Sequence, residues 1–98
     1  MKVIYKYEIK AGSNEFELPS DAKPLTVQMQ DNKPYMWVLL DPESPKVKRY
    51  FFTIGTGHII DNIMLKEYDR NINSLGDYIG TFQLTDFALV FHLFEIIK

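Results

Sequence analysis

An all-β fold is the class that this sequence predicts, as a small antiparallel β-sandwich or flattened barrel of about seven strands. Three observations lead to it. Apolar and polar residues alternate with a period of two in several segments, which is typical of half-buried strands. Clusters of Gly, Pro, Asn and Asp separate these segments at short intervals. The chain is 98 residues long and 46% hydrophobic, which fits a single domain over residues 1–98 with one compact core.

Two hairpins are expected in the first part of the chain. Residues 3–9 alternate apolar with charged, and the turn-forming residues 11–14 lead to a shorter alternation over 15–18 that ends at Pro19. We interpret these two strands as the first hairpin. The second pairs residues 25–30 with a strand that begins at Tyr35, after a turn at 31–34.

The middle of the chain supplies two further strands. Residues 35–40 are apolar on both faces, which is typical of a central strand covered on each side. A loop with two prolines follows at 41–46, and residues 47–54 form the next strand. The sequence GlyThrGlyHis at 55–58 then requires unusual backbone angles or a close approach by another group.

The last part is ambiguous at first and then strand-like. Apolar residues recur every fourth position over 59–74, so one short helix within 61–70 and an ordered loop are both open. Residues 78–84 and 88–97 are two final strands. The run 87–97 is apolar on both faces, which indicates cover by a second layer or by another subunit, so we expect a homodimer or a higher homo-oligomer.

Composition excludes several functions. The net charge of −2 argues against duplex nucleic acid as a partner, because such binding needs clustered Lys and Arg. The absence of cysteine removes disulfides, thiolate zinc sites and thiol nucleophiles. The charged N-terminal segment lacks the apolar run of a signal peptide or membrane span, so we expect an intracellular protein without a membrane partner.

The glycine loop is the first candidate binding feature. Backbone N–H groups freed by glycine geometry can hold an anion, and the side chains of Thr56 and His58 are candidate phosphate donors. The alternative is an ordinary tight turn at the end of a strand.

A basic cluster precedes that loop by one strand length. Lys48 and Arg49 are candidate charge partners for phosphate, and Tyr50 is a candidate stacking surface. Lys48 and Tyr50 share one face of the strand and Arg49 lies on the other, so only part of the cluster can converge on one ligand. The alternative is a solvated, charged sheet edge.

No metal, cofactor or catalytic residue is expected. The two histidines, His58 and His92, have no cysteine or third histidine to complete a zinc site. His92 alternates with Val90 and Phe94, which favours a core or interface histidine with a hydrogen-bond partner. The scattered acids of 61–77 are typical of a hydrated surface.

Several segments resemble a family of small uncharacterised bacteriophage and prophage proteins. They are GTGH at 55–58, YIGTFQL at 78–84 and ALVFHLFE at 88–95, with weaker similarity at the start of the chain and in VLLDPESP at 38–45. The connection between His58 and Asp77 is longer here than is usual in that family.

The resemblance implies a non-enzymatic phage accessory protein that acts in the host bacterial cytoplasm against bacterial defence. Two mechanisms follow from it. The first is sequestration of a nucleotide-derived immune signal through glycine-loop amides, basic side chains and aromatic stacking. The second is direct binding and blocking of a host defence protein through an aromatic or acidic surface or an added edge strand.

Overall fold

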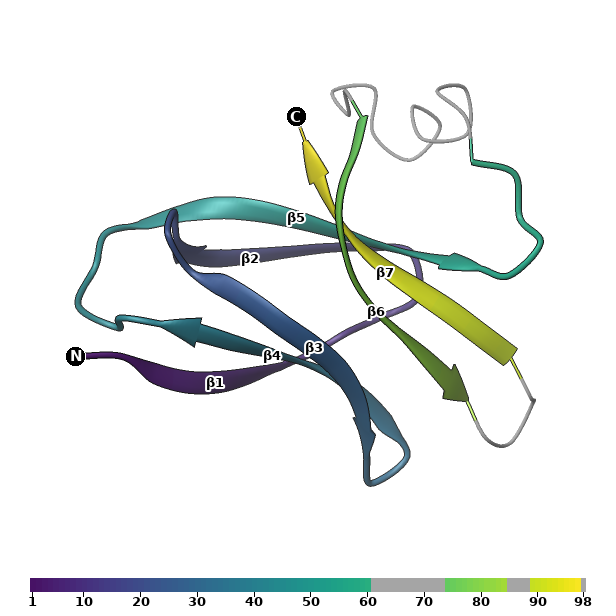
Figure 1. The fold of residues 1–98 in the computed structure, drawn as a ribbon, viewed down its shortest axis with the longest axis horizontal. Coiled ribbons are helices and arrows are strands. Elements are labelled where there is room, and N and C mark those ends of the chain that lie inside the picture. Colours follow the sequence, from purple (N-terminus) through teal and green to yellow (C-terminus); the bar gives the residue numbers. More distant parts are fainter. Residues whose placement is uncertain (61–73, 85–88, 98) are drawn as a thin grey trace.

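The computed structural model describes residues 1–60, 74–84 and 89–97, and these residues form seven antiparallel strands in two sheets (Figure 1). The strands are β1 (Val3–Glu8), β2 (Ser13–Pro19), β3 (Lys23–Gln30), β4 (Lys33–Leu40), β5 (Lys46–Gly55), β6 (Ser74–Leu84) and β7 (Leu89–Ile97). The predicted all-β class and the small β-sandwich are therefore confirmed. The short helix considered for 61–70 lies outside the described residues.

The first sheet has three strands in the order β1-β4-β3. β3 and β4 form the predicted second hairpin, closed by Asp31 and Asn32 with φ values of 53° and 64°. Two successive positive φ angles are those of a type I′ turn, whose twist matches that of the strands it joins, and Asp and Asn tolerate the conformation better than most residues. The turn therefore sets the β3–β4 register, from Gln30 opposite Lys33 onward.

The second sheet has four strands in the order β2-β5-β7-β6. The two predicted final strands correspond to β6 and β7, which pair antiparallel. β7 lies between β5 and β6, and both of its faces carry buried apolar residues: Leu93 packs in the core between the sheets, and Ile96 packs with Phe52 on the other face. The homodimer or higher homo-oligomer expected from the apolar run stays a prediction.

The predicted hairpin of the first two strands is wrong, because β1 pairs with β4 and β2 pairs with β5. The chain changes sheets between them. Ile9 is buried and its N–H donates to the carbonyl of Pro34, which extends the first sheet by one residue. The Asn14 side chain then braces the crossing, because it accepts from Lys10 N–H at 2.8 Å and donates to the Lys10 carbonyl at 2.9 Å. Alternation showed two strands correctly but carried no information about their partners.

Alternate residues of the strands fill one core between the sheets. Its fully buried members include Leu18, Val27, Met36, Val38, Phe51 and Leu93. A smaller apolar cluster on the other face of the four-stranded sheet contains Phe52, Ile54 and Ile96. In the part of the chain that the structure describes, no helix is present that could cross a membrane.

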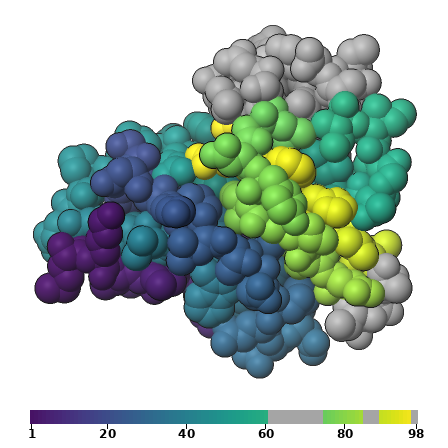
Figure 2. All heavy atoms as spheres, viewed as in Figure 1, coloured from purple at the N-terminus to yellow at the C-terminus, as the bar shows by residue number. Residues whose placement is uncertain are grey.

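β3 and β6 lie against each other and join the two sheets along one side (Figure 2). The contact is close at Gly80, where an added Cβ would lie 2.7 Å from Val27 Cγ1 and 3.2 Å from the Val27 backbone nitrogen. Glycine is needed there because a larger side chain would separate the strands.

Replacing Gly80 with alanine is expected to lower the free energy of unfolding by about 1–3 kcal/mol, the usual effect of overpacking. Chemical denaturation of the single variants Gly80→Ala and Val27→Ala and of the double variant measures this. We expect the double variant to lose less stability than the two single losses combined, since Val27→Ala removes the closer of the two clashing atoms. A Gly80→Ala protein as stable as the wild type would contradict this packing.

Candidate functional site

The five residues predicted to contact a ligand lie in three separate places. Lys48 and Tyr50 are on the outer face of β5, as their spacing predicted, and Arg49 is on the inner side of the same strand. Thr56 and His58 lie beyond the other end of β5. Thr56 is six positions after Tyr50 along an extended chain, a distance of about 20 Å. One protomer therefore does not bring these five side chains to one ligand.

Arg49 is held by the fold. Its Nε and Nη2 donate to the two carboxylate oxygens of Glu95 at 2.8 and 2.7 Å. Its Nη1 donates to the carbonyls of Pro19 and Ala22 at 3.0 and 2.7 Å. The Arg49 and Glu95 side chains are only 14% and 21% exposed. This bidentate pair fastens the β2–β3 turn to the four-stranded sheet, and it neutralises the charge that a phosphate would require.

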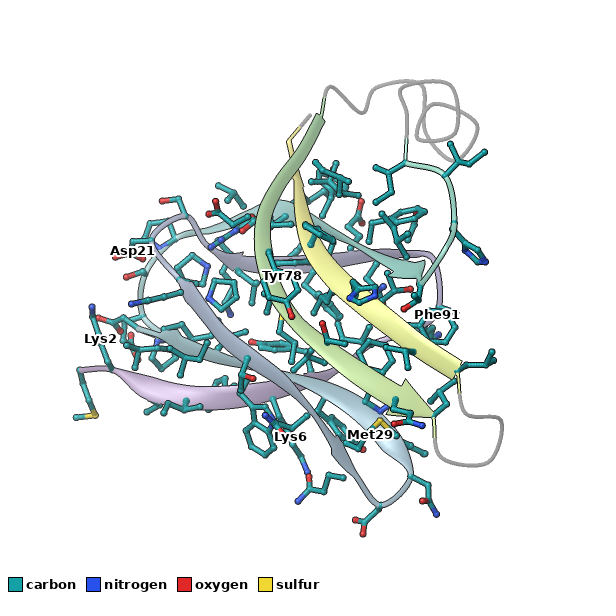
Figure 3. All side chains as sticks on the ribbon, turned by 45° about the vertical axis from the view of Figure 1, so that its right-hand side comes forward. Lys2, Lys6, Asp21, Met29, Tyr78 and Phe91 are labelled. Atoms are coloured by element: carbon teal, nitrogen blue, oxygen red, sulfur yellow. The ribbon has the colours of Figure 1, made fainter. Side chains whose placement is uncertain are left out.

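A hollow of about 630 Å³ lies over this ion pair and is also lined by Asp21, Asp77 and Tyr78. Figure 3 shows Asp21 at the turn before β3 and Tyr78 on β6. Carboxylates of Asp21, Asp77 and Glu95 outnumber the cations Arg49 and, also in the lining, Lys23. The hollow is therefore an unfavourable place for a phosphate.

The glycine loop is a tight turn, the alternative considered from the sequence. His58 N–H donates to the Gly55 carbonyl at 3.1 Å, and Gly57 has a φ of 87°, as the third position of a type II turn requires. Thr56 N–H donates to the Val90 carbonyl at 3.0 Å. The amides of Thr56 and His58, which were expected to help hold an anion, are thus bonded to carbonyls. The exposed His58 ring lies over Gly55, where an added Cβ would be 2.9 Å from His58 Cε1.

His92 has the hydrogen-bond partners that its position predicted. Its ring nitrogens lie 2.8 Å from Thr56 Oγ1 and 3.0 Å from Thr81 Oγ1, and Tyr78 bonds Thr81 in turn. The Thr56 hydroxyl also donates to the Val90 carbonyl at 3.4 Å. This row of polar groups joins the turn after β5 to β7 and β6, and it gives both ring nitrogens of the histidine a partner within the fold.

The outer face of the three-stranded sheet has a different character. Met36, Val38 and Leu40 of β4 point into the core, so the alternate residues of β4 and those opposite them point outward. We call the resulting surface the aromatic–lysine face. Its members are Ile4, Lys6 and Glu8 of β1, Lys33, Tyr35, Trp37 and Leu39 of β4, and Lys23, Thr26, Gln28 and Gln30 of β3.

Lys6 lies at the centre of this face, and its ammonium is 4.5 Å from the ring centre of Tyr35 and 5.7 Å from that of Trp37. It donates to the amide oxygen of Gln30. Figure 3 shows Lys6 projecting from the three-stranded sheet on the side away from β6 and β7. The ammonium is thus placed by two rings and a neutral amide, and no carboxylate among the described residues forms an ion pair with it.

The charge balance also favours an anion here. Three lysines and one glutamate share the aromatic–lysine face in a chain whose net charge is −2. Among the described residues, Lys6, Lys23 and Lys33 form no ion pair. By contrast, Lys48 is directly opposite Glu17, and Tyr50 is directly opposite Glu15.

Trp37 adds an unsatisfied donor to the face. Its side chain is half-buried, and the indole Nε1 is buried with no hydrogen-bond acceptor within the described ranges. A buried donor without an acceptor is costly in a native structure. An acceptor atom of a ligand that displaces the groups covering the indole would relieve this cost.

The described residues contain no cluster of three or more metal-ligating side chains. The chemistry that the aromatic–lysine face provides is stacking on Tyr35 and Trp37 combined with charge from lysine. Sequence reasoning missed this site because Lys6 is 29 positions before Tyr35 and was interpreted only as a polar position of an alternating strand. The usable signal was the alternation of Tyr35 and Trp37 with buried residues in β4, which shows that both rings share the uncovered face.

The fold and this surface define a class: a small antiparallel β-sandwich with an open aromatic and basic sheet face. Within that class, the chain belongs to the family described as a domain of unknown function (DUF7352), whose model matches residues 1–98. Neither the curated proteins nor the solved structures contain a significant match to the chain.

Proposed function

We propose that this protein is a non-enzymatic binding protein that sequesters a nucleotide-derived signal on the aromatic–lysine face. The observation that carries the proposal is the position of the Lys6 ammonium over the Tyr35 and Trp37 rings. Nucleotides combine a planar base with phosphate, and they are bound by stacking on aromatic side chains beside cations. This face combines both elements without a paired carboxylate among the described residues.

The proposal moves the site away from Lys48, Arg49, Tyr50, Thr56 and His58. The Arg49 guanidinium is already paired with the Glu95 carboxylate, and the backbone amides of Thr56 and His58 already donate to backbone carbonyls. The non-enzymatic reading is supported by His92, both of whose ring nitrogens bind hydroxyl groups.

The biological role follows from the resemblance of GTGH, YIGTFQL and ALVFHLFE to phage and prophage proteins. We place the protein in the host bacterial cytoplasm, where sequestration of an immune signal would counter bacterial defence. A stoichiometric binder can do this without turnover, provided that its affinity exceeds that of the host receptor.

Direct binding of a host defence protein is the second candidate. It is favoured by Ile4, which is 56% exposed, and by Leu39, which both extend the two rings into an apolar patch. Trp and Tyr are also enriched in the energetically dominant parts of protein interfaces. A pull-down from defence-bearing cells would then recover one stoichiometric protein.

A thermal-shift panel of cyclic di- and trinucleotides and ADP-ribose derivatives tests the proposed function. We expect at least one member to raise the melting temperature in a concentration-dependent way, because it binds only the folded state. Inorganic phosphate and unphosphorylated nucleosides are the matched controls and should be much weaker. A panel without any shift would contradict the sequestration proposal, and conversion of the ligand during incubation would contradict the non-enzymatic one.

A further inference from the structure

The outer edge of β1 pairs with no other described strand, and two large apolar side chains of β1 are exposed. β1 is bonded to β4 on one side, and no other described strand pairs with it. Ile4 and Tyr5, which point to opposite faces of the strand, are 56% and 47% exposed. Proteins usually protect such an edge, since its free N–H and C=O groups are a template for another strand.

The hydrogen bonds show which backbone groups of β1 are free. Ile9 N–H donates to the carbonyl of Pro34, and the register places these residues opposite each other. In an antiparallel ladder, bonded and non-bonded positions alternate, so odd residues of β1 face β4 and even residues face outward. The β3–β4 turn agrees, because its closing pair directs Lys33 toward β3 and therefore Pro34 toward β1. Ile4, Lys6 and Glu8 thus offer their N–H and C=O groups to a partner.

We propose that two copies of the chain associate through β1 in an antiparallel, two-fold pair in which Lys2 lies opposite the partner's Glu8. Only registers that place even residues opposite even residues can form the ladder, because the odd residues point away. In the proposed register, Ile4 and the partner's Lys6 exchange backbone hydrogen bonds. Tyr5 meets the partner's Tyr5 at the two-fold axis.

The charges of opposing side chains and the availability of backbone hydrogen-bonding groups favour this register over the neighbouring ones. A shift of two residues in one direction places Lys6 opposite the partner's Lys6, and a shift of two residues in the other direction places Lys2 opposite the partner's Lys6. Like charges directly opposite are destabilising in both cases. A shift of four residues in the first direction places Ile4 opposite the partner's Lys10, whose backbone N–H already donates to Asn14. The proposed register instead forms the Lys2–Glu8 pair twice and brings the exposed Ile4 and Tyr5 into the interface.

The dimer would join two three-stranded sheets into one sheet of six strands. Each β4 is then separated from its copy by three strand spacings, about 14 Å. Residues that lie opposite each other in the two β1 strands point to the same side of the joined sheet. The two aromatic–lysine faces therefore form one continuous surface. If the proposed function also holds, one ligand with two-fold symmetry could contact both halves. Only this consequence, and not the dimer itself, rests on the proposed function.

Sedimentation equilibrium of the ligand-free protein tests the association. The wild type is expected to be a dimer at micromolar or higher concentration. Each of the variants Lys2→Glu and Glu8→Lys should weaken dimerisation by about tenfold or more, since two attractive pairs become repulsive. The double variant Lys2→Glu with Glu8→Lys restores opposite charges and should recover the wild-type dimer.

A wild-type protein that remains monomeric over the accessible concentration range would overturn the proposal. A dimer that neither single variant weakens, or that the double variant fails to restore, would overturn this register. Both positions are exposed, so circular dichroism should show an unchanged fold. No ligand is used, so these outcomes are independent of the thermal-shift panel.

Discussion

Replacing Arg49 with alanine is expected to lower the free energy of unfolding by about 3 kcal/mol. The guanidinium makes two bonds to Glu95 and one each to the carbonyls of Pro19 and Ala22. Its removal leaves a carboxylate that is only 21% exposed without a counter-ion, together with two carbonyls that lose their donors. Urea unfolding followed by circular dichroism measures the loss as a lower midpoint at unchanged slope.

Lys48→Ala is the matched control for this experiment. Lys48 is the neighbouring cation on the same strand, but it is exposed, so its removal should change stability by less than about 0.5 kcal/mol. If the two variants were equally stable, the Arg49 side chain would be solvated in the folded protein, and its ion pair with Glu95 would not stabilise the fold. A large loss confined to Arg49→Ala would instead show that this arginine is structural.

Replacing Lys6 with alanine is expected to weaken binding of the nucleotide ligand by about tenfold or more while the melting temperature of the free protein stays nearly unchanged. Lys6 is exposed, and its ammonium interacts with the Tyr35 and Trp37 rings and the Gln30 amide. Its loss therefore removes a phosphate partner without opening the core. Isothermal titration with the ligand found in the thermal-shift panel measures the change.

The same titration of Lys48→Ala separates the two candidate sites. This variant removes an equal charge from the site predicted by sequence, on the other sheet. We expect its affinity to match the wild type. Loss of binding in Lys48→Ala together with full binding in Lys6→Ala would show that the ligand binds at β5 and not at the aromatic–lysine face.

Most strands could be predicted from the sequence, because each depends on local alternation and local turns. Asp31 and Asn32 formed the expected turn, so the β3–β4 hairpin was predictable. The pairing of β1 with β4 was not predictable. The chain leaves the first sheet after Ile9, and only the burial of Ile9 and its hydrogen bond to Pro34 show this. The interior position of β7 likewise depends on β5, which is distant in the chain.

The candidate site was less predictable because its parts come from different strands. The shared face of Lys48 and Tyr50 followed from strand geometry and is present. The pairing of Arg49 with Glu95, 46 positions later, is a tertiary contact that no local pattern indicates. The approach of Lys6 to Tyr35 and Trp37 depends on the β1–β4 register in the same way.

The fluorescence of Trp37 tests the central claim most directly, because it is the single tryptophan of the chain and lies within the aromatic–lysine face. A base that stacks beside it should change its emission, and the concentration dependence should give the same dissociation constant as calorimetry. We predict saturable quenching or a spectral shift in the wild type and in Lys48→Ala, and a response weakened about tenfold in Lys6→Ala. Calorimetric binding without any change in Trp37 emission would contradict the assignment of the ligand to this face.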